Sequence, residues 1–253
     1  MKVSKIAPIV VAASWGTVSF IWSKMDHSTA LKFSQVRGAA CDEPFIANFI
    51  IPGFVVPPRG ALLALADHMI GDVYIVEHTG SRLNVESYMN QICAQIDRVG
   101  YDSVRIFAIS NASKIAYYLP INHLSPELYL INPITNSLEI RESAKKSINN
   151  LLIGERIPRF LLGPFGDIVV RKNRSSFNER FSQYEDMVRP SEITTYGKNF
   201  RIVLSSSDQI SDPGIIRMEC DGCRLAEIDT EHADFEKYTT LYIEALESLG
   251  AFR

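Results

Sequence analysis

Three side chains that can pass a proton between them stand in a fixed order along the chain: Ser110, Asp208 and His232. A serine hydroxyl is a poor nucleophile at neutral pH and needs a base within hydrogen-bond reach, a task that suits neutral histidine. A carboxylate can hold the imidazole in the correct tautomer and stabilise its charged form. These residue types predict attack on an acyl carbonyl, with Ser110 as nucleophile, His232 as general base and Asp208 as the residue that orients the histidine.

The surroundings of Ser110 favour an exposed nucleophile. The serine follows the apolar stretch 103–109 directly, and residues 111–116 can begin a helix. A serine on such an abrupt strand-to-helix turn presents its hydroxyl, and amides at the helix N-terminus can bind an oxyanion. Ala108 and Ala112 flank the turn, and both are small enough to allow it. The alternative is an ordinary helix N-cap, a position where serine is favoured.

Four acids compete for the role beside His232. Asp208 falls in a turn four residues after an apolar stretch ends, and Asp212 lies further along the same loop. Asp229 and Asp234 flank the histidine in sequence. Asp208 is favoured because the end of a strand holds it in place, and Asp212 is the first alternative.

Six apolar stretches, most of them followed by turn residues, predict the strands that position these side chains. They cover residues 45–51, 72–77, 103–109, 128–131, 200–204 and 224–228. Helical patterns lie between and after them, at 61–69, 85–96 and 235–249. This alternation predicts a doubly wound α/β fold with a mostly parallel sheet, whose functional loops lie at the carboxyl ends of the strands.

Serine, then aspartate, then histidine, each in a loop after a strand, is the chain order of the α/β hydrolases, and the sequence resembles that superfamily over roughly residues 45–249. Residues 52–54 are similar to the family's oxyanion loop. Residues 205–213 are similar to its acid turn, and residues 232–235 to its histidine loop. No subfamily is assigned, because the resemblance lies in strand order and three loops.

The resemblance implies an α/β-hydrolase fold and an oxyanion hole formed by the backbone amides of Phe54 and Asn111. The sequence departs from the family pattern at three places. Pro52 replaces the usual histidine of the oxyanion loop, Ser205 replaces the usual glycine of the acid turn, and alanines replace both glycines around Ser110. None of these departures removes a reacting group.

Residues 135–198 interrupt the alternation of strands and helices, which predicts a cap or lid insertion. Within it, residues 140–152 have a helical pattern. The alternative is that part of the segment packs as an ordinary crossover helix. The apolar stretch 161–170 suggests a lipophilic acyl substrate, unless it packs over the core.

The N-terminal segment has the pattern of a membrane or export signal. Lys2 and Lys5 precede the uncharged residues 6–22, and Lys24 follows them. An uncleaved signal anchor over residues 1–25 is favoured; a cleaved signal peptide and a buried or interfacial helix are the alternatives. A tether over 26–44 and a hydrolase domain over 45–253 would follow. The expected location is membrane-anchored or exported, and extracytoplasmic rather than cytoplasmic.

Several classes of function are disfavoured. The net charge of -3 provides no electrostatic footprint for nucleic acid, and neither a dinucleotide-binding nor a P-loop glycine pattern occurs. Cys220 and Cys223 have metal-like spacing, but no second pair completes a zinc site, which leaves a local disulfide or two free thiols. Neither a cofactor nor a metal is expected.

Together these patterns predict hydrolysis of a carboxylic ester, or of a related acyl bond such as a thioester, through an acyl-enzyme. The alternative is an inactive hydrolase-fold protein that serves as a membrane-tethered binding module, which the altered oxyanion and elbow positions motivate. That alternative predicts that Ser110 and His232 are not within about 3 Å of each other, or that no ester is turned over.

Overall fold

The computed structural model describes residues 31–40, 45–53, 59–78, 85–119, 126–144 and 196–252. The expected anchor over 1–25, most of the expected cap insertion and Phe54 lie outside these residues. Of the helices in the described ranges, none has both the length and the apolar character to cross a bilayer.

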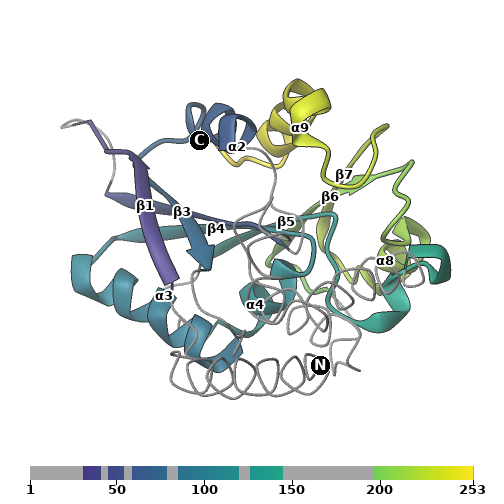
Figure 1. Ribbon diagram of the computed structural model, residues 1–253, viewed down its shortest axis with the longest axis horizontal. Coiled ribbons are helices and arrows are strands. Elements are labelled where there is room, and N and C mark those ends of the chain that lie inside the picture. The colour runs from purple at the N-terminus through teal and green to yellow at the C-terminus, as the bar shows by residue number, and fades with distance from the viewer. Residues whose placement is uncertain are drawn as a thin grey trace, which may run out of the picture.

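A single sheet organises the described part of the chain, with the strand order β1-β3-β2-β4-β5-β6-β7 (Figure 1). The strands are β1 (Leu31–Arg37), β2 (Ile46–Ile51), β3 (Asp72–His78), β4 (Ser103–Ile109), β5 (Glu127–Ile131), β6 (Phe200–Ser205) and β7 (Arg224–Ile228). Strand β1 pairs antiparallel with β3, and all other neighbours are parallel. All six predicted strands are present, and the doubly wound, mostly parallel α/β fold is confirmed.

Helices cover both faces of the sheet, which is why its central strands are mostly apolar, with exceptions such as Asn48 in β2 and Arg105 in β4. Figure 1 shows α2 (Arg59–Ala66) and α9 (Phe235–Ser248) over one face, and α3 (Val85–Val99) and α4 (Ala112–Tyr118) over the other. Each pair of helices contributes to its own core, and β2 is buried at every residue. The predicted helix 85–96 continues to Val99 and stops at Gly100, whose φ of +75° suits glycine.

Strand β1 corrects the expected tether over 26–44. Leu31–Arg37 forms the antiparallel edge of the sheet, with Leu31 and Phe33 packed against the core. Lys32 and Ser34 instead contact the Glu77 carboxylate on β3, at 3.5 and 3.2 Å. Lys32, Ser34 and Gln35 separate the apolar residues of β1, so its sequence lacks the nearly continuous apolar run by which the central strands were recognised.

The start of the expected cap insertion is attached to the acid-bearing loop after β6. Ile140, the first residue of the helix expected over 140–152, instead forms an isolated antiparallel bridge with Ser211. The short helix η1 (Ser137–Glu139) precedes it, and the Arg141 amide donates to the carbonyl of Ile210. Residues 142–144 are helical, as predicted, and the rest of that helix, from residue 145 onward, lies outside the described residues.

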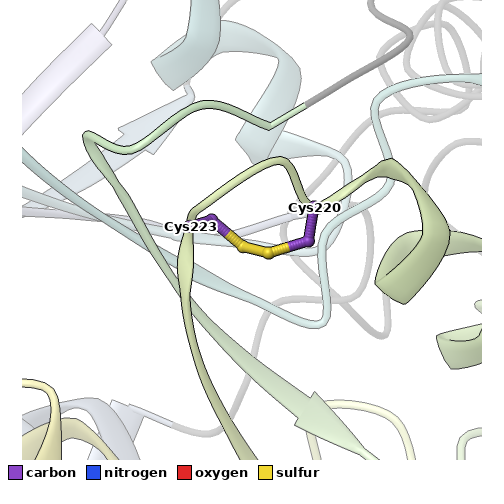
Figure 2. Close-up of a disulfide and its surroundings, with 2 residues drawn as sticks. All are labelled: Cys220 and Cys223. Atoms are coloured by element: carbon purple, nitrogen blue, oxygen red, sulfur yellow. A yellow bond between two sulfur atoms is a disulfide. The ribbon is translucent and has the colours of Figure 1, made fainter.

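Cys220 and Cys223 form a disulfide in the turn between α8 (Pro213–Glu219) and β7 (Figure 2). Their Cα atoms are 5.5 Å apart, a separation that a disulfide spans without backbone movement. Gly222, with a φ of +75°, allows the chain to reverse between them. The structure therefore selects the disulfide from the two states that the spacing left open.

Candidate active site

Ser110 occupies a strained turn between β4 and α4. Its φ is +56°, in the left-handed region that residues other than glycine rarely adopt. Backbone hydrogen bonds hold it there: its amide donates to Ile131 at 2.8 Å, and its carbonyl accepts from Ser113 and Ile134 at 3.1 Å each. Such strain persists only where the surroundings fix the backbone, and it is common at active sites.

The hydroxyl of Ser110 faces His232 rather than capping helix α4. Asn111 is the N-cap of α4, and no side-chain hydrogen bond caps the helix. The Ser110 Oγ lies 3.0 Å from the His232 Nε2. The N-cap alternative for Ser110 therefore does not agree with the structure.

Small residues surround the turn, as its tight geometry requires. Ala108 and Ala112 are buried on either side of Ser110. A Cβ atom on Gly53 would lie 2.5 Å from the Ile109 carbonyl oxygen and 2.8 Å from the Ser110 Cβ. The loop after β2 thus lies directly against the serine, and only glycine permits this approach.

His232 lies in the short loop between β7 and α9. Ala233 follows it with a φ of +48°, and the Phe235 amide donates to the Ala233 carbonyl at 2.9 Å. Asp234 then caps α9 by accepting a hydrogen bond from the Lys237 amide. The imidazole is buried, with 7% of its side-chain area exposed.

Asp208 is almost completely buried and accepts four hydrogen bonds. One oxygen, Oδ1, accepts from the amides of Ile210 and Ser211 at 2.7 and 2.9 Å. The other, Oδ2, accepts from the Ser211 hydroxyl and lies 2.6 Å from the His232 Nδ1. Every lone-pair direction of the carboxylate thus has a donor, which offsets the cost of burying its charge.

These contacts keep the Asp208 carboxylate ionised. Burial alone would raise the pKa of Asp208, but the hydrogen bond and charge of His232 and the donors in its own loop hold the pKa below its usual value. Because the carboxylate is ionised and accepts only, the His232 Nδ1 carries the proton. The Nε2 nitrogen is then the acceptor that faces the Ser110 hydroxyl.

The competing acids have other structural roles. Asp212 is the N-cap of α8 and accepts from the Gly214 amide at 2.9 Å. Asp229 is exposed and accepts from the hydroxyls of Ser206 and Ser207, and Asp234 caps α9. Asp208 is the one of these four acids that the structure places against His232.

Of the two residues expected to form an oxyanion hole, the structure describes Asn111 and not Phe54. Asn111 follows Ser110 at the N-terminus of α4, so its amide lies beside the serine. Phe54 is outside the described residues, but its neighbour Gly53 lies against the Ser110 Cβ. The end of the loop that leads to Phe54 therefore lies against the serine turn.

The sequence analysis missed several polar residues around this site. Asn132, Thr230 and Tyr242 are buried, and they form hydrogen bonds with one another and with Ser205, which had been noted only as a departure from the family pattern. Asn132 directly follows β5, so a polar residue at the carboxyl end of a central strand was the available signal.

A second buried polar cluster lies next to the loop that carries Asp208. The Glu139 carboxylate accepts from the hydroxyls of Tyr196 and Thr135 and from the Asn136 amide. Burial, followed by the hydrogen bond and charge of Glu139, raises the pKa of the nearby Glu219 to about 7. The Glu139 carbonyl in turn accepts from the Asp212 amide, which connects this cluster to the loop that carries Asp208.

No protein-family model and no curated protein sequence matches the chain. Solved structures do. A hydrolase from Pseudomonas aeruginosa PA01 is similar with a TM-score of 0.61 at 11% identity, covering 90% of this chain and 97% of that one. An esterase from Exiguobacterium antarcticum has a TM-score of 0.61 at 13% identity, covering 88% of this chain and 96% of that one.

The likeness extends to an α/β hydrolase from a Medee basin deep-sea metagenome library, with a TM-score of 0.63 at 11% identity, covering 88% of this chain and 94% of that one. Other similar structures include a thioesterase domain and epoxide hydrolases. At such low identity the comparisons establish a shared fold, and the reaction has to be argued from the residues of the site.

Proposed function

We propose that this chain, whose fold is that of the α/β hydrolases, is a serine hydrolase that cleaves a carboxylic ester or a related acyl bond through an acyl-enzyme. The observation that carries the proposal is one hydrogen-bonded chain of side chains: Ser110 Oγ to His232 Nε2 at 3.0 Å, and His232 Nδ1 to Asp208 Oδ2 at 2.6 Å. This is the arrangement that a serine nucleophile needs for activation.

The proposed reaction has two stages. In the first, His232 Nε2 takes the hydroxyl proton of Ser110 as Oγ attacks the carbonyl carbon, and the imidazolium then protonates the leaving group. In the second, His232 takes a proton from water, whose oxygen attacks the acyl carbon, and returns that proton to Ser110. Asp208 holds Nδ1–H throughout and stabilises the imidazolium, so both stages use the same tautomer.

The oxyanion of each tetrahedral intermediate needs donors on the other side of the carbonyl. In this proposal the backbone amides of Asn111 and Phe54 supply them, each contributing about 3 to 4 kcal/mol to transition-state stabilisation. Backbone amides serve this purpose whatever the side chain, so the replacement of a histidine by Pro52 does not remove a donor from this arrangement.

The alternative of an inactive binding module receives less support. It predicts that Ser110 and His232 are separated or that no ester is turned over, and the hydrogen-bond contact between the two side chains speaks against the first of these outcomes. The burial and full hydrogen bonding of Asp208 also favour a working site, because a buried carboxylate with no function is a cost that a binding module need not retain.

A fluorophosphonate probe tests the proposal, because it phosphonylates an activated serine. Wild type is expected to be labelled, and Ser110→Ala is not. Ser113→Ala is the matched control: it lies one turn further along, is equally buried, and its hydroxyl has no hydrogen-bond partner among the described residues. Loss of labelling in Ser113→Ala, or retention in Ser110→Ala, would refute the assignment.

The lipophilic acyl group and the location belong to the same proposal. Initial rates across p-nitrophenyl esters from acetate to palmitate test the preference for a lipophilic acyl group, with faster turnover of the longer chains expected.

An extracytoplasmic location draws support from the Cys220–Cys223 disulfide, because disulfides persist in oxidising compartments. Membrane fractionation of the chain with and without residues 1–25 tests the anchor.

A further inference from the structure

Four buried polar side chains form what we call the hydroxyl network, beside the loops that carry the proposed catalytic residues. They are Asn132, Ser205, Thr230 and Tyr242, and none is more than 2% exposed. The Ser205 Oγ lies 2.7 Å from the Thr230 Oγ1 and 3.0 Å from the Tyr242 hydroxyl. Asn132 Nδ2 donates to Ser205 at 2.9 Å and to Tyr242 at 3.2 Å.

The single hydroxyl proton of Tyr242 has a defined destination. It is donated to the backbone carbonyl of Glu231, at 3.1 Å. With its proton so placed, the tyrosine oxygen has only its lone pairs to offer the three donors around it, Asn132, Ser205 and Thr230. The network thus delivers one directed hydrogen bond, and the group that receives it belongs to the residue immediately before His232.

The same network reaches the loops of all three proposed catalytic residues. Thr230 and Glu231 lead directly into His232. Ser205 ends β6, and its carbonyl accepts from the Asp208 amide at 3.2 Å. Asn132 follows β5, and two residues later the Ile134 amide donates to the Ser110 carbonyl.

Asn132 is held in the conformation that this role requires. Its φ is +46°, and its Oδ1 accepts from the Ser205 amide at 2.9 Å. Asparagine is one of the residues that tolerate the left-handed region. Its side chain therefore continues the β5–β6 pairing beyond the last backbone bonds, and keeps the two strand ends at a fixed separation.

The ring of Tyr242 is held separately from its hydroxyl. It stacks on Phe235, with centroids 4.2 Å apart and planes 20° apart, within the core between α9 and the sheet. Removal of the oxygen alone leaves this packing in place. The contribution of the directed hydrogen bond can therefore be measured in a folded variant.

We propose that Tyr242 is a positioning residue whose hydroxyl, held by Asn132, Ser205 and Thr230, fixes the Glu231 carbonyl and thereby the imidazole of His232 against Ser110. The inference rests on the proposed function, because it assigns a part in the same site. A fully satisfied buried network is rigid, and catalytic groups displaced by a fraction of an ångström lose much of their effect. The glycine that is usual at position 205 in the family has no hydroxyl and could not form the hydrogen bonds that Ser205 forms in this network.

The test compares Tyr242→Phe with Tyr101→Phe. Tyr101 is also buried and its hydroxyl is bonded to Tyr74 and Asp72, but it precedes β4, whereas Ser110 follows the other end of that strand. We expect Tyr242→Phe to slow fluorophosphonate labelling by about 10- to 100-fold. For p-nitrophenyl acetate we expect kcat to fall with KM unchanged, whereas Tyr101→Phe changes the melting temperature and neither kinetic constant.

A second measurement separates this inference from the proposed function. Ring ¹⁵N chemical shifts in ¹⁵N-histidine-labelled protein report the His232 tautomer, which in wild type carries its proton on Nδ1. A shift toward a mixture of tautomers in Tyr242→Phe, absent in Tyr101→Phe, supports positioning even if wild type is not labelled and the hydrolase assignment fails. Wild-type ring shifts in Tyr242→Phe overturn the inference, and so does labelling of Tyr242→Phe within twofold of a wild type that is itself labelled.

Discussion

The His232 Nδ1 lies 2.6 Å from the Asp208 Oδ2, although the two residues belong to loops that follow different strands. Strands β6 and β7 are parallel neighbours, with Ser205 paired to Ile228, so their carboxyl ends bring the two loops together. The buried carboxylate has its pKa lowered and accepts a hydrogen bond from the imidazole Nδ1–H, which leaves Nε2 to face Ser110. Several consequences can be measured.

Asp208→Asn should reduce the labelling of Ser110 by up to about 10⁴-fold, the loss known for the equivalent change in a serine protease, because an amide in place of the carboxylate favours the wrong tautomer. Asp212→Asn is the matched control, since asparagine also caps helices well and should retain the α8 cap. Labelling rates of both variants decide between the two acids. A larger loss in Asp212→Asn would reverse the assignment.

Gly53→Ala should impair both folding and labelling, because the added methyl group would meet the Ile109 carbonyl oxygen at 2.5 Å. Overpacking of this kind costs about 1 to 3 kcal/mol. Gly60→Ala is the control: nothing lies within 4 Å of its Cβ position on α2, so stability should rise by up to about 1 kcal/mol. Urea denaturation measures the stability of both variants. Equal changes in stability would show that the turn beside Ser110 has room for a methyl group.

Glu219→Gln should change how stability depends on pH. Burial, and then Glu139, raise the pKa of Glu219 from 4.5 to about 7. Between these values the folded protein holds a proton that the unfolded chain has released, so stability falls as pH rises through this window. Glutamine cannot ionise and removes this loss.

Melting temperatures at pH 5 and pH 8 test this prediction. The decrease from pH 5 to pH 8 should be smaller in Glu219→Gln than in wild type. Glu244→Gln, on the exposed side of α9, should keep the wild-type difference. If all three proteins show the same difference between the two pH values, the raised pKa of Glu219 is ruled out.

The Cys220–Cys223 disulfide should be detectable by mass. Alkylation of the denatured protein should modify two more thiols after reduction than before it. The double variant Cys220→Ser/Cys223→Ser should lose at most about 2 kcal/mol of stability, because the closed loop is short. Labelling of Ser110 should persist, since neither cysteine contacts the proposed catalytic residues. Equal alkylation with and without reductant would contradict the disulfide.

The sequence alone determined the strands of the buried sheet and the order of the reactive residues. Stretches such as 103–109, in which Arg105 is the one charged residue, were recognised because helices cover both faces of these strands, and loops at parallel strand ends converge whatever their sequence. Strand β1 escaped recognition because polar residues such as Lys32 and Ser34 separate its apolar residues. The exposed half of its pattern resembles a polar linker.

The tertiary structure decided what depends on contacts between distant residues. Asp208, Asp212, Asp229 and Asp234 are chemically alike, and only the pairing of β6 with β7 brings one of them to His232. The hydroxyl network joins residues up to 110 positions apart, so no local pattern announces it. Ser110 shows this dependence on tertiary structure most clearly. In the sequence, its flanking alanines weakened the nucleophile motif. Its φ of +56° and the close approach of Gly53 arise from the packing of distant segments against the turn.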